Sequence, residues 1–200
     1  LHGDHYFGLI GFLTTLHLLG RKDELHLYAP PGLEEIINLQ LEASLTSLIY
    51  PLVFHPLSGE APEVIFEDER VEVKSFPLKH SVPTFGFRFS EKIKIRKLPV
   101  ARSYAYCSDT AYNEEIIPWI REIDLLYHET TFMTDKAKVA AEKMHSTTIE
   151  AATIAKKSRV KKLLIGHFSA RYDNLLPILE EARSVFPETY LAEDGMTIHI

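Results

Sequence analysis

Residues 1–5 read "LHGDH" and run directly into the apolar stretch "YFGLIGFL" of residues 6–13. His2, Asp4 and His5 place two imidazoles and a carboxylate within four positions, where nitrogen and oxygen donors can collect one or two metal ions. The same residues could instead form an ordinary solvated chain end or a helix cap. The donors elsewhere in the sequence decide between these alternatives.

The composition predicts one globular domain, residues 1–200, with a substantial core. No apolar run approaches the roughly 18 residues that span a membrane, so we expect no membrane partner. Cys107 is the only cysteine, which excludes an internal disulfide and favours a reducing compartment, the cytoplasm. It lies in an apolar run and is interpreted as a small buried hydrophobe.

Apolar periodicity predicts a mixed α/β chain without an internal repeat. Helical spacing marks residues 6–22, 31–43, 113–123, 135–144, 147–158 and 175–186. Apolar and β-branched runs predict strands at 25–30, 52–57, 63–68, 71–78, 84–90, 102–110, 124–132 and 160–168, and a closing strand pair at 189–200. Thr147 and Glu150 have the spacing of a capping box.

Polar donors follow four of these strands at the points where the strands end. In layered α/β folds the strand ends form the rim on which sites are built. One histidine after a strand is more often a loop residue than a ligand, but four such endings and the opening cluster together favour a metal site. Imidazole and carboxylate without thiolate suit a catalytic zinc, manganese or iron ion. The four endings are His80, Asp109, His128-Glu129 and His167.

Several motifs carry a family resemblance. "LHGDH" resembles the end of the His-x-His-x-Asp-His signature of the metallo-β-lactamase superfamily. The later motifs resemble those of the ribonuclease Z family, whose members trim the 3′ end of precursor tRNA, and they occur in the right order over nearly the whole chain. They are "HSVPTFGFRF" (80–89), "YCSDTAYNE" (106–114), "LLYHETTF" (125–132, with Thr130 in place of alanine), "KMHSTTIEAA" (143–152) and "IGHFSARY" (165–172).

The resemblance implies an α/β fold, the metallo-β-lactamase αβ/βα four-layer sandwich of two facing mixed sheets with helices outside. It also implies two Zn²⁺ ions, or Mn²⁺ or another divalent cation, and water attack on a phosphodiester of precursor tRNA. Asp109 would bridge two cations about 3.5–4 Å apart. One ion would take His2, His80 and Asp109, and the other Asp4, His5, Asp109 and His167.

The resemblance implies catalytic roles as well. Asp4 would be the general base for the attacking water. His145, oriented by Glu129, would contact the scissile phosphate or protonate the leaving 3′ oxygen, and Arg171 would hold a phosphate through its bidentate fork. His128 is either a residue that supports the ligands or a purely structural one.

The chain departs from the family pattern in several places. The first ligand histidine and the first strands would precede Leu1. Only 28 residues separate His80 from Asp109, which is short for this family. We therefore expect that residues of the family's flexible tRNA-gripping arm are missing from this sequence near residues 98–102, although an ordinary loop there is the alternative. The segment "IKIR" (93–96) departs from the family's Pro-x-Lys-x-Arg element. Discrimination against mature CCA ends is therefore not assumed.

The charge pattern bears on RNA binding. A net charge of −6 argues mildly against a nucleic-acid binder, although bound dications would neutralise central carboxylates. Two basic runs are either RNA-binding patches or solvated surface. They comprise Lys92, Lys94, Arg96 and Lys97, and Lys156, Lys157, Arg159, Lys161 and Lys162.

Two other functions stay open beside the tRNA-processing enzyme. The same donors would serve a zinc phosphodiesterase acting on small diesters, or a non-catalytic member of the superfamily that binds RNA or protein. The retained donor set speaks against the non-catalytic reading. The family also suggests a homodimer, to which "FGLIGFL" (7–13) could contribute.

Overall fold

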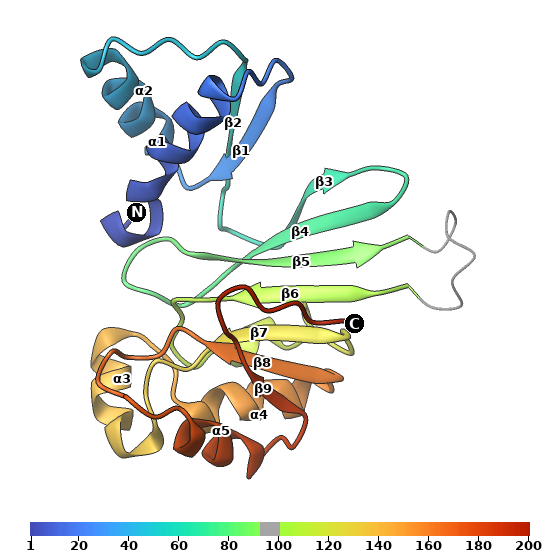
Figure 1. The fold of residues 1–200 in the computed structure, drawn as a ribbon. Coiled ribbons are helices and arrows are strands. Elements are labelled where there is room, and N and C mark those ends of the chain that lie inside the picture. The colour runs from blue at the N-terminus through green and yellow to red at the C-terminus, as the bar shows by residue number, and fades with distance from the viewer. Residues whose placement is uncertain (93–100) are drawn as a thin grey trace. The chain divides into compact units, whose positions relative to one another are not determined.

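The structure is a computed structural model that describes residues 1–92 and 101–200 (Figure 1). It divides into two compact units, Leu1–Ser58 and Gly59–Ile200. Residues 93–100 lie outside the described residues, and with them most of the first basic run and part of the segment where the arm was expected. Within the described ranges, no helix has both the length and the apolar character required to cross a membrane.

The first unit is a small α/β unit. Its elements are α1 (Gly3–Leu18), β1 (Leu25–Ala29), α2 (Leu33–Ala43) and β2 (Leu52–Pro56). The two strands are parallel, with Leu25 opposite Leu52, and α2 is the crossover between them. Leu13 of α1 and Ile37 of α2 are fully buried with Ala29 and Leu33 in one apolar cluster.

The second unit contains a mixed seven-stranded sheet in the order β3-β4-β5-β6-β7-β8-β9 (Figure 1). Strands β3 to β6 pair antiparallel, and β6 to β9 pair parallel. Strands β3 and β4 form a hairpin, and in its turn Asp68 Oδ1 accepts hydrogen bonds from the backbone N–H groups of Arg70 and Val71. The strands are Glu63–Glu67, Val71–Pro77, Phe85–Glu91, Ser103–Cys107, Leu125–Glu129, Lys162–Gly166 and Thr189–Leu191.

Helices connect the parallel strands of this sheet. Helix α3 (Ala137–Lys143) and α4 (Thr148–Ser158) lie between β7 and β8, and α5 (Leu176–Arg183) lies between β8 and β9. The predicted capping box is confirmed, because the Thr147 and Glu150 side chains each bond the other residue's backbone N–H.

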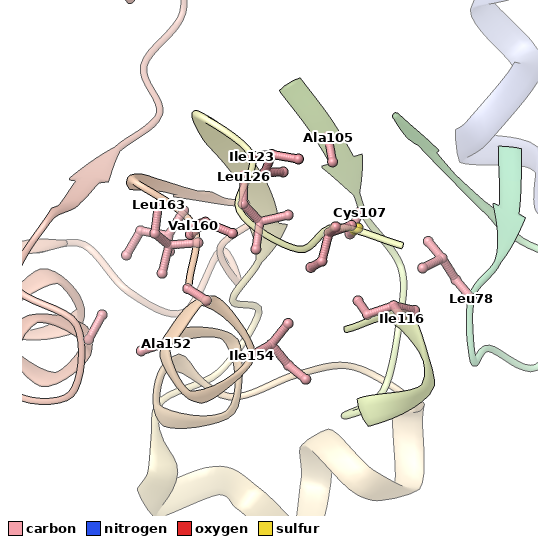
Figure 2. Close-up of a cluster of buried hydrophobic side chains, with 14 of the residues drawn as sticks. Leu78, Ala105, Cys107, Ile116, Ile123, Leu126, Ala152, Ile154, Val160 and Leu163 are labelled. Carbon is pink, nitrogen blue, oxygen red and sulfur yellow. The ribbon is translucent and has the colours of Figure 1, made fainter. Parts of the chain in front are cut away.

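The core of the second unit lies between the parallel strands and helices α4 and α5 (Figure 2). Ala152 and Ile154 of α4 pack in the same buried cluster as Leu126 of β7 and Leu163 of β8. Cys107 is buried in this cluster, as predicted, and burial raises the pKa of its thiol, so it behaves as a small apolar side chain.

Two predicted elements are shorter than the sequence pattern indicates. Residues 113–123 form only a short 3₁₀ helix, Glu114–Ile116, followed by turns, because Pro118 lacks the N–H that a continuing helix needs. The predicted closing strand pair is a single strand, β9. A turn follows it, with Gly195 at φ +77°, and residues 192–200 join no strand.

Candidate active site and metal centre

The opening cluster forms one group of potential ligands at the start of α1. Helix α1 begins at Gly3, so His2 precedes the helix and both Asp4 and His5 lie in its first turn. One ligand atom from each of these three residues lies within 4.8 Å of the others. His2 occupies the N-cap position of α1, as the helix-cap alternative expected, but its side chain makes no capping hydrogen bond. The structure thus places these three donors close together within the first unit.

A second group of potential ligands lies in the second unit, at one edge of the sheet. Asp109 follows β6 and His167 directly follows β8, while His145 lies in the loop between α3 and α4. Their ligand atoms also lie within 4.8 Å of one another. His167 Nε2 is 3.4 Å from Asp109 Oδ1, and the rings of His145 and His167 have centroids 5.3 Å apart. The carboxyl ends of the parallel strands β6 and β8 thus bring Asp109 and His167 together, and the loop between α3 and α4 adds His145, which the sequence did not predict as a metal ligand.

The backbone turns sharply at this edge of the sheet. Asp109, Met144 and His167 have φ angles of 57°, 57° and 58°, in the left-handed region that few non-glycine residues adopt. Such conformations cluster at functional sites, where the surrounding structure stabilises them. Here each one lies at, or directly before, a residue of the second ligand group.

His80 is held by the loop that carries His145. His80 Nδ1 lies 3.0 Å from the backbone oxygen of Met144, and its ring centroid lies 5.3 Å from that of His145. A carbonyl oxygen can only accept a hydrogen bond, so the proton of His80 is on Nδ1. This leaves Nε2 of His80 as the nitrogen suited to metal binding.

Glu129, the last residue of β7, is the centre of a buried hydrogen-bond network. Its side chain is fully buried. Its Oε1 accepts hydrogen bonds from His145 Nδ1 at 2.8 Å and from the Thr110 N–H at 2.7 Å. Its Oε2 accepts from the Thr131 hydroxyl at 2.5 Å, the Ser146 N–H at 3.2 Å and the Thr131 N–H at 3.3 Å. Five donors on one carboxylate stabilise its ionised form.

The network sets the charges of Glu129 and His145. Burial alone raises the pKa of Glu129, but the hydrogen bonds from His145, Thr131 and the Thr110 N–H outweigh it and hold that pKa below its ordinary value. The hydrogen bond to Glu129 raises the pKa of His145, against the opposing effect of burial. The pair therefore favours a carboxylate beside an imidazolium, so His145 is an acid that lies beside Asp109 and His167.

Three residues of this network escaped the sequence prediction. Thr110, Thr131 and Ser146 bind Glu129 and occur one or two positions from predicted site residues in the motifs "SDT", "HETT" and "HS". Thr131 Oγ1 also lies 2.8 Å from His167 Nδ1. Their proximity in the sequence to predicted site residues was the available signal.

His128 and Arg171 lie outside both ligand groups. His128 is 1% exposed, its Nδ1 donates to the backbone oxygen of Glu129 at 2.8 Å, and burial lowers its pKa, so it is a neutral core residue of β7. Arg171 lies in the exposed loop after β8, and within the described parts of the chain it makes no hydrogen bond or ion pair.

The second basic run is partly neutralised by acidic neighbours. Lys157 binds Glu114 at 2.5 Å, and Lys161 binds Asp124 at 2.6 Å. Such exposed pairs are typical of a solvated surface. Much of this basic run is therefore solvated surface, which is the second of the two alternatives.

The donor chemistry fits divalent metal ions. In the described ranges, both ligand groups consist of imidazoles and carboxylates, and the thiol of Cys107 is buried away from them in the core. Oxygen and nitrogen donors of this kind suit catalytic zinc or manganese rather than a closed thiolate site.

Comparison with known proteins decides the family. The model of the beta-lactamase superfamily domain matches residues 1–168. The chain is 40% identical over 239 aligned residues to ribonuclease Z from Cytophaga hutchinsonii, covering 99% of this chain and 76% of the relative. The chain belongs to the ribonuclease Z family of the metallo-β-lactamase superfamily. Ribonuclease Z from Bacteroides thetaiotaomicron is 39% identical, with coverage of 100% of this chain and 76% of that protein.

Solved structures agree with membership in the ribonuclease Z family. The crystal structure of the short form of human tRNase Z matches with a TM-score of 0.79 and 34% identity, covering 100% of this chain and 76% of that one. The metallo-β-lactamase fold protein YhfI of Bacillus subtilis, at 21% identity and a TM-score of 0.74, shows the shared fold alone. The predicted α/β metallo-β-lactamase fold is thereby confirmed, and this fold implies the use of divalent metal ions.

Proposed function

We propose that this chain is a zinc-dependent endoribonuclease that removes the 3′ trailer of precursor tRNA. Its relatives at 36–40% identity are named ribonuclease Z, and the similar human structure is a tRNase Z. The observation that carries the proposal is the buried Glu129–His145 pair at 2.8 Å, which holds a proton donor beside the Asp109–His167 ligand pair.

The proposed ligands come from both groups of donors. When bound, two divalent ions lower the pKa of a coordinated water and stabilise charge on the phosphate oxygens. That both groups serve one centre is inferred from the family motifs. One ion is assigned to His2, His80 and Asp109, and the other to Asp4, His5, Asp109 and His167.

Four side chains perform the remaining chemistry in this proposal. Asp4 orients the attacking water and accepts its proton. His145 donates a proton to the leaving 3′ oxygen, and Glu129 keeps that imidazole charged and correctly turned. Arg171, which makes no hydrogen bond or ion pair with the described residues, binds a phosphate oxygen of the substrate.

The biological setting follows the same family expectation. We propose a single domain over residues 1–200, acting in the cytoplasm as a homodimer in which one subunit positions the tRNA that the other cleaves. Sedimentation of the purified chain with and without precursor tRNA would test the dimer.

The experiment that tests the function is mapping of the 3′ ends of a precursor tRNA after incubation with the protein and Zn²⁺. We expect cleavage next to the discriminator nucleotide that is lost with a chelator and in Asp4→Ala. Asp23→Ala, which changes an exposed carboxylate in the same unit, is the matched control and should cleave normally.

Two other results would replace the proposed function. An intact precursor with a small phosphodiester still hydrolysed would replace the proposal with the small-substrate phosphodiesterase. Bound RNA with neither substrate cleaved would favour the non-catalytic alternative.

A further inference from the structure

Thr131 occupies a bridging position between two functional side chains. It lies two residues beyond the end of β7 and is 7% exposed. Its hydroxyl oxygen is 2.5 Å from Glu129 Oε2 and 2.8 Å from His167 Nδ1. A single hydroxyl group therefore joins the buried carboxylate to a predicted metal ligand.

The directions of these two hydrogen bonds follow from the chemistry of the groups. The ionised carboxylate of Glu129 can only accept, so the Thr131 hydroxyl donates its one proton to it. The Thr131 oxygen is then left with lone pairs alone. His167 Nδ1 must consequently carry a proton and donate it to Thr131. Nε2 of His167, which lies 3.4 Å from Asp109 Oδ1, is then the ring nitrogen left to bind a metal ion.

The backbone holds this contact independently of the hydroxyl. The Thr130 N–H donates to the backbone oxygen of Gly166 at 2.9 Å, and the Ser169 N–H donates to the backbone oxygen of Thr131 at 3.1 Å. These two bonds dock the loop after β7 against the loop after β8 on both sides of the Thr131–His167 contact. The hydroxyl is therefore not needed to join the loops.

We infer that Thr131 is a positioning residue that fixes His167 in the Nδ1–H tautomer and so presents Nε2 to a divalent cation. This inference rests on the proposed function only in taking His167 as a metal ligand. An imidazole without such a partner favours the Nε2–H form in water, which would place a proton on the nitrogen that has to bind. Partners of this kind typically change metal affinity by about 10–100-fold.

The bridge also gives Glu129 a second task. The same carboxylate orients His145 directly, through Oε1, and His167 indirectly, through Oε2 and Thr131. The proton donor and a metal ligand are thus aligned by one buried group. Loss of the Thr131 hydroxyl should disturb His167 while leaving the hydrogen bond between Glu129 and His145 in place.

Three variants of the full chain separate the hydroxyl from its surroundings. Thr131→Val removes the hydroxyl and keeps the shape, whereas Thr131→Ser keeps the hydroxyl. Thr130→Ala is the matched control, because Thr130 is a neighbour that is also buried and, among the described residues, its hydroxyl reaches only the Gly166 oxygen, at 3.4 Å.

The first readout is the ¹⁵N spectrum of the His167 ring in the metal-free protein, at about pH 8, above the ordinary histidine pKa. It shows directly which ring nitrogen is protonated. The second is Zn²⁺ affinity, measured by competition with a coloured chelator. We expect the Nδ1–H form in the unaltered chain, in Thr131→Ser and in Thr130→Ala. In Thr131→Val we expect a shift toward the Nε2–H form and an affinity about 10–100-fold weaker.

Several outcomes would overturn the inference. An Nε2–H tautomer of His167 in the unaltered chain would do so without any variant, which keeps the test decisive if Thr131→Val does not fold. The inference would also be overturned by an unchanged Zn²⁺ affinity in Thr131→Val or by a weakened Zn²⁺ affinity in Thr131→Ser. A loss of Zn²⁺ affinity in Thr130→Ala equal to that in Thr131→Val would overturn it as well. A chain that shows the expected tautomer and affinities but cuts no precursor tRNA would refute the proposed function alone.

Discussion

His145 Nδ1 lies 2.8 Å from Glu129 Oε1, although the two residues are 16 positions apart and come from a loop and a strand. In this pair His145 is the acid, and Glu129 raises the pKa of its imidazole. Glu129 is fully buried, so its charge acts on His145 in an environment that screens it weakly.

Replacing Glu129 with glutamine should reduce stability and turnover together. The NH₂ group of glutamine can only donate hydrogen bonds, and in either orientation it would face groups that are themselves donors. These are Thr131 and Ser146 on one side, or His145 and Thr110 on the other. We expect a loss of about 1–3 kcal/mol in the free energy of unfolding, measured by urea denaturation. Unchanged stability would show that these hydrogen bonds contribute little.

The pH dependence of cleavage should report on His145. Its pKa is raised by Glu129, and the acid works only when protonated, so kcat should fall as pH rises through this raised value. In Glu129→Gln the carboxylate is gone and this fall should move to lower pH. In His145→Ala the decrease of kcat with rising pH should disappear, and kcat itself should be lower by about 10²–10⁴-fold. An identical pH profile in Glu129→Gln would contradict the assignment.

Replacing Asp4 with alanine should abolish chemistry without unfolding the chain. Its side chain is 79% exposed in the first turn of α1, so its removal leaves no hole in the core. We expect turnover to fall by about 10²–10⁴-fold, in line with loss of a general base. Single-turnover cleavage and thermal unfolding measure the two effects, and a normal rate would remove Asp4 from the mechanism.

Replacing Arg171 with alanine should weaken transition-state stabilisation by about 2–4 kcal/mol, as for other preorganised donors. The side chain is exposed and unpaired within the described ranges, so stability should not change. Values of kcat/KM for a precursor tRNA measure the loss, with the exposed Arg121→Ala as control. Equal rates for both variants would leave Arg171 as a surface residue.

Stability at acid pH should depend on Asp124, away from the site. It accepts hydrogen bonds from the Ser103 N–H at 2.7 Å and hydroxyl at 2.9 Å, and from Lys161 at 2.6 Å. Burial raises the pKa of Asp124, but these bonds outweigh it and the net pKa is lowered. A depressed folded pKa stabilises the fold above the unfolded value of about 3.9, and this stabilisation is lost as pH falls through the folded pKa.

Asp124→Asn should therefore be less stable than the unaltered chain at neutral pH, by about 1–2 kcal/mol, with most of the loss from the Ser103 bonds because Lys161 is exposed. The difference should shrink below about pH 4. Urea denaturation at several pH values measures it, with the exposed Asp135→Asn as control. A difference independent of pH would contradict the cited pKa shift.

Much of the site was visible in the sequence because strand ends are local features. Asp109, Glu129 and His167 each follow an apolar run, and parallel strands bring their carboxyl ends to one edge. The two predictions that went wrong had different causes. Pro118 limits the expected helix over residues 113–123, which is a local effect. The second closing strand is missing because residues 192–200 pair with no strand among the described residues, which is a tertiary effect.

The amino-acid sequence by itself determined the family, the α/β class and the chemical types of the donors, since these depend on residue identity, order and local periodicity. Only the tertiary structure decided how the donors are held. Thr131 meets His167 across 36 positions because β7 and β8 pair with Glu129 opposite Gly166, which places the residues beyond both strand ends side by side. Strand register is a property of the packed sheet, so no local pattern in either segment reveals that contact.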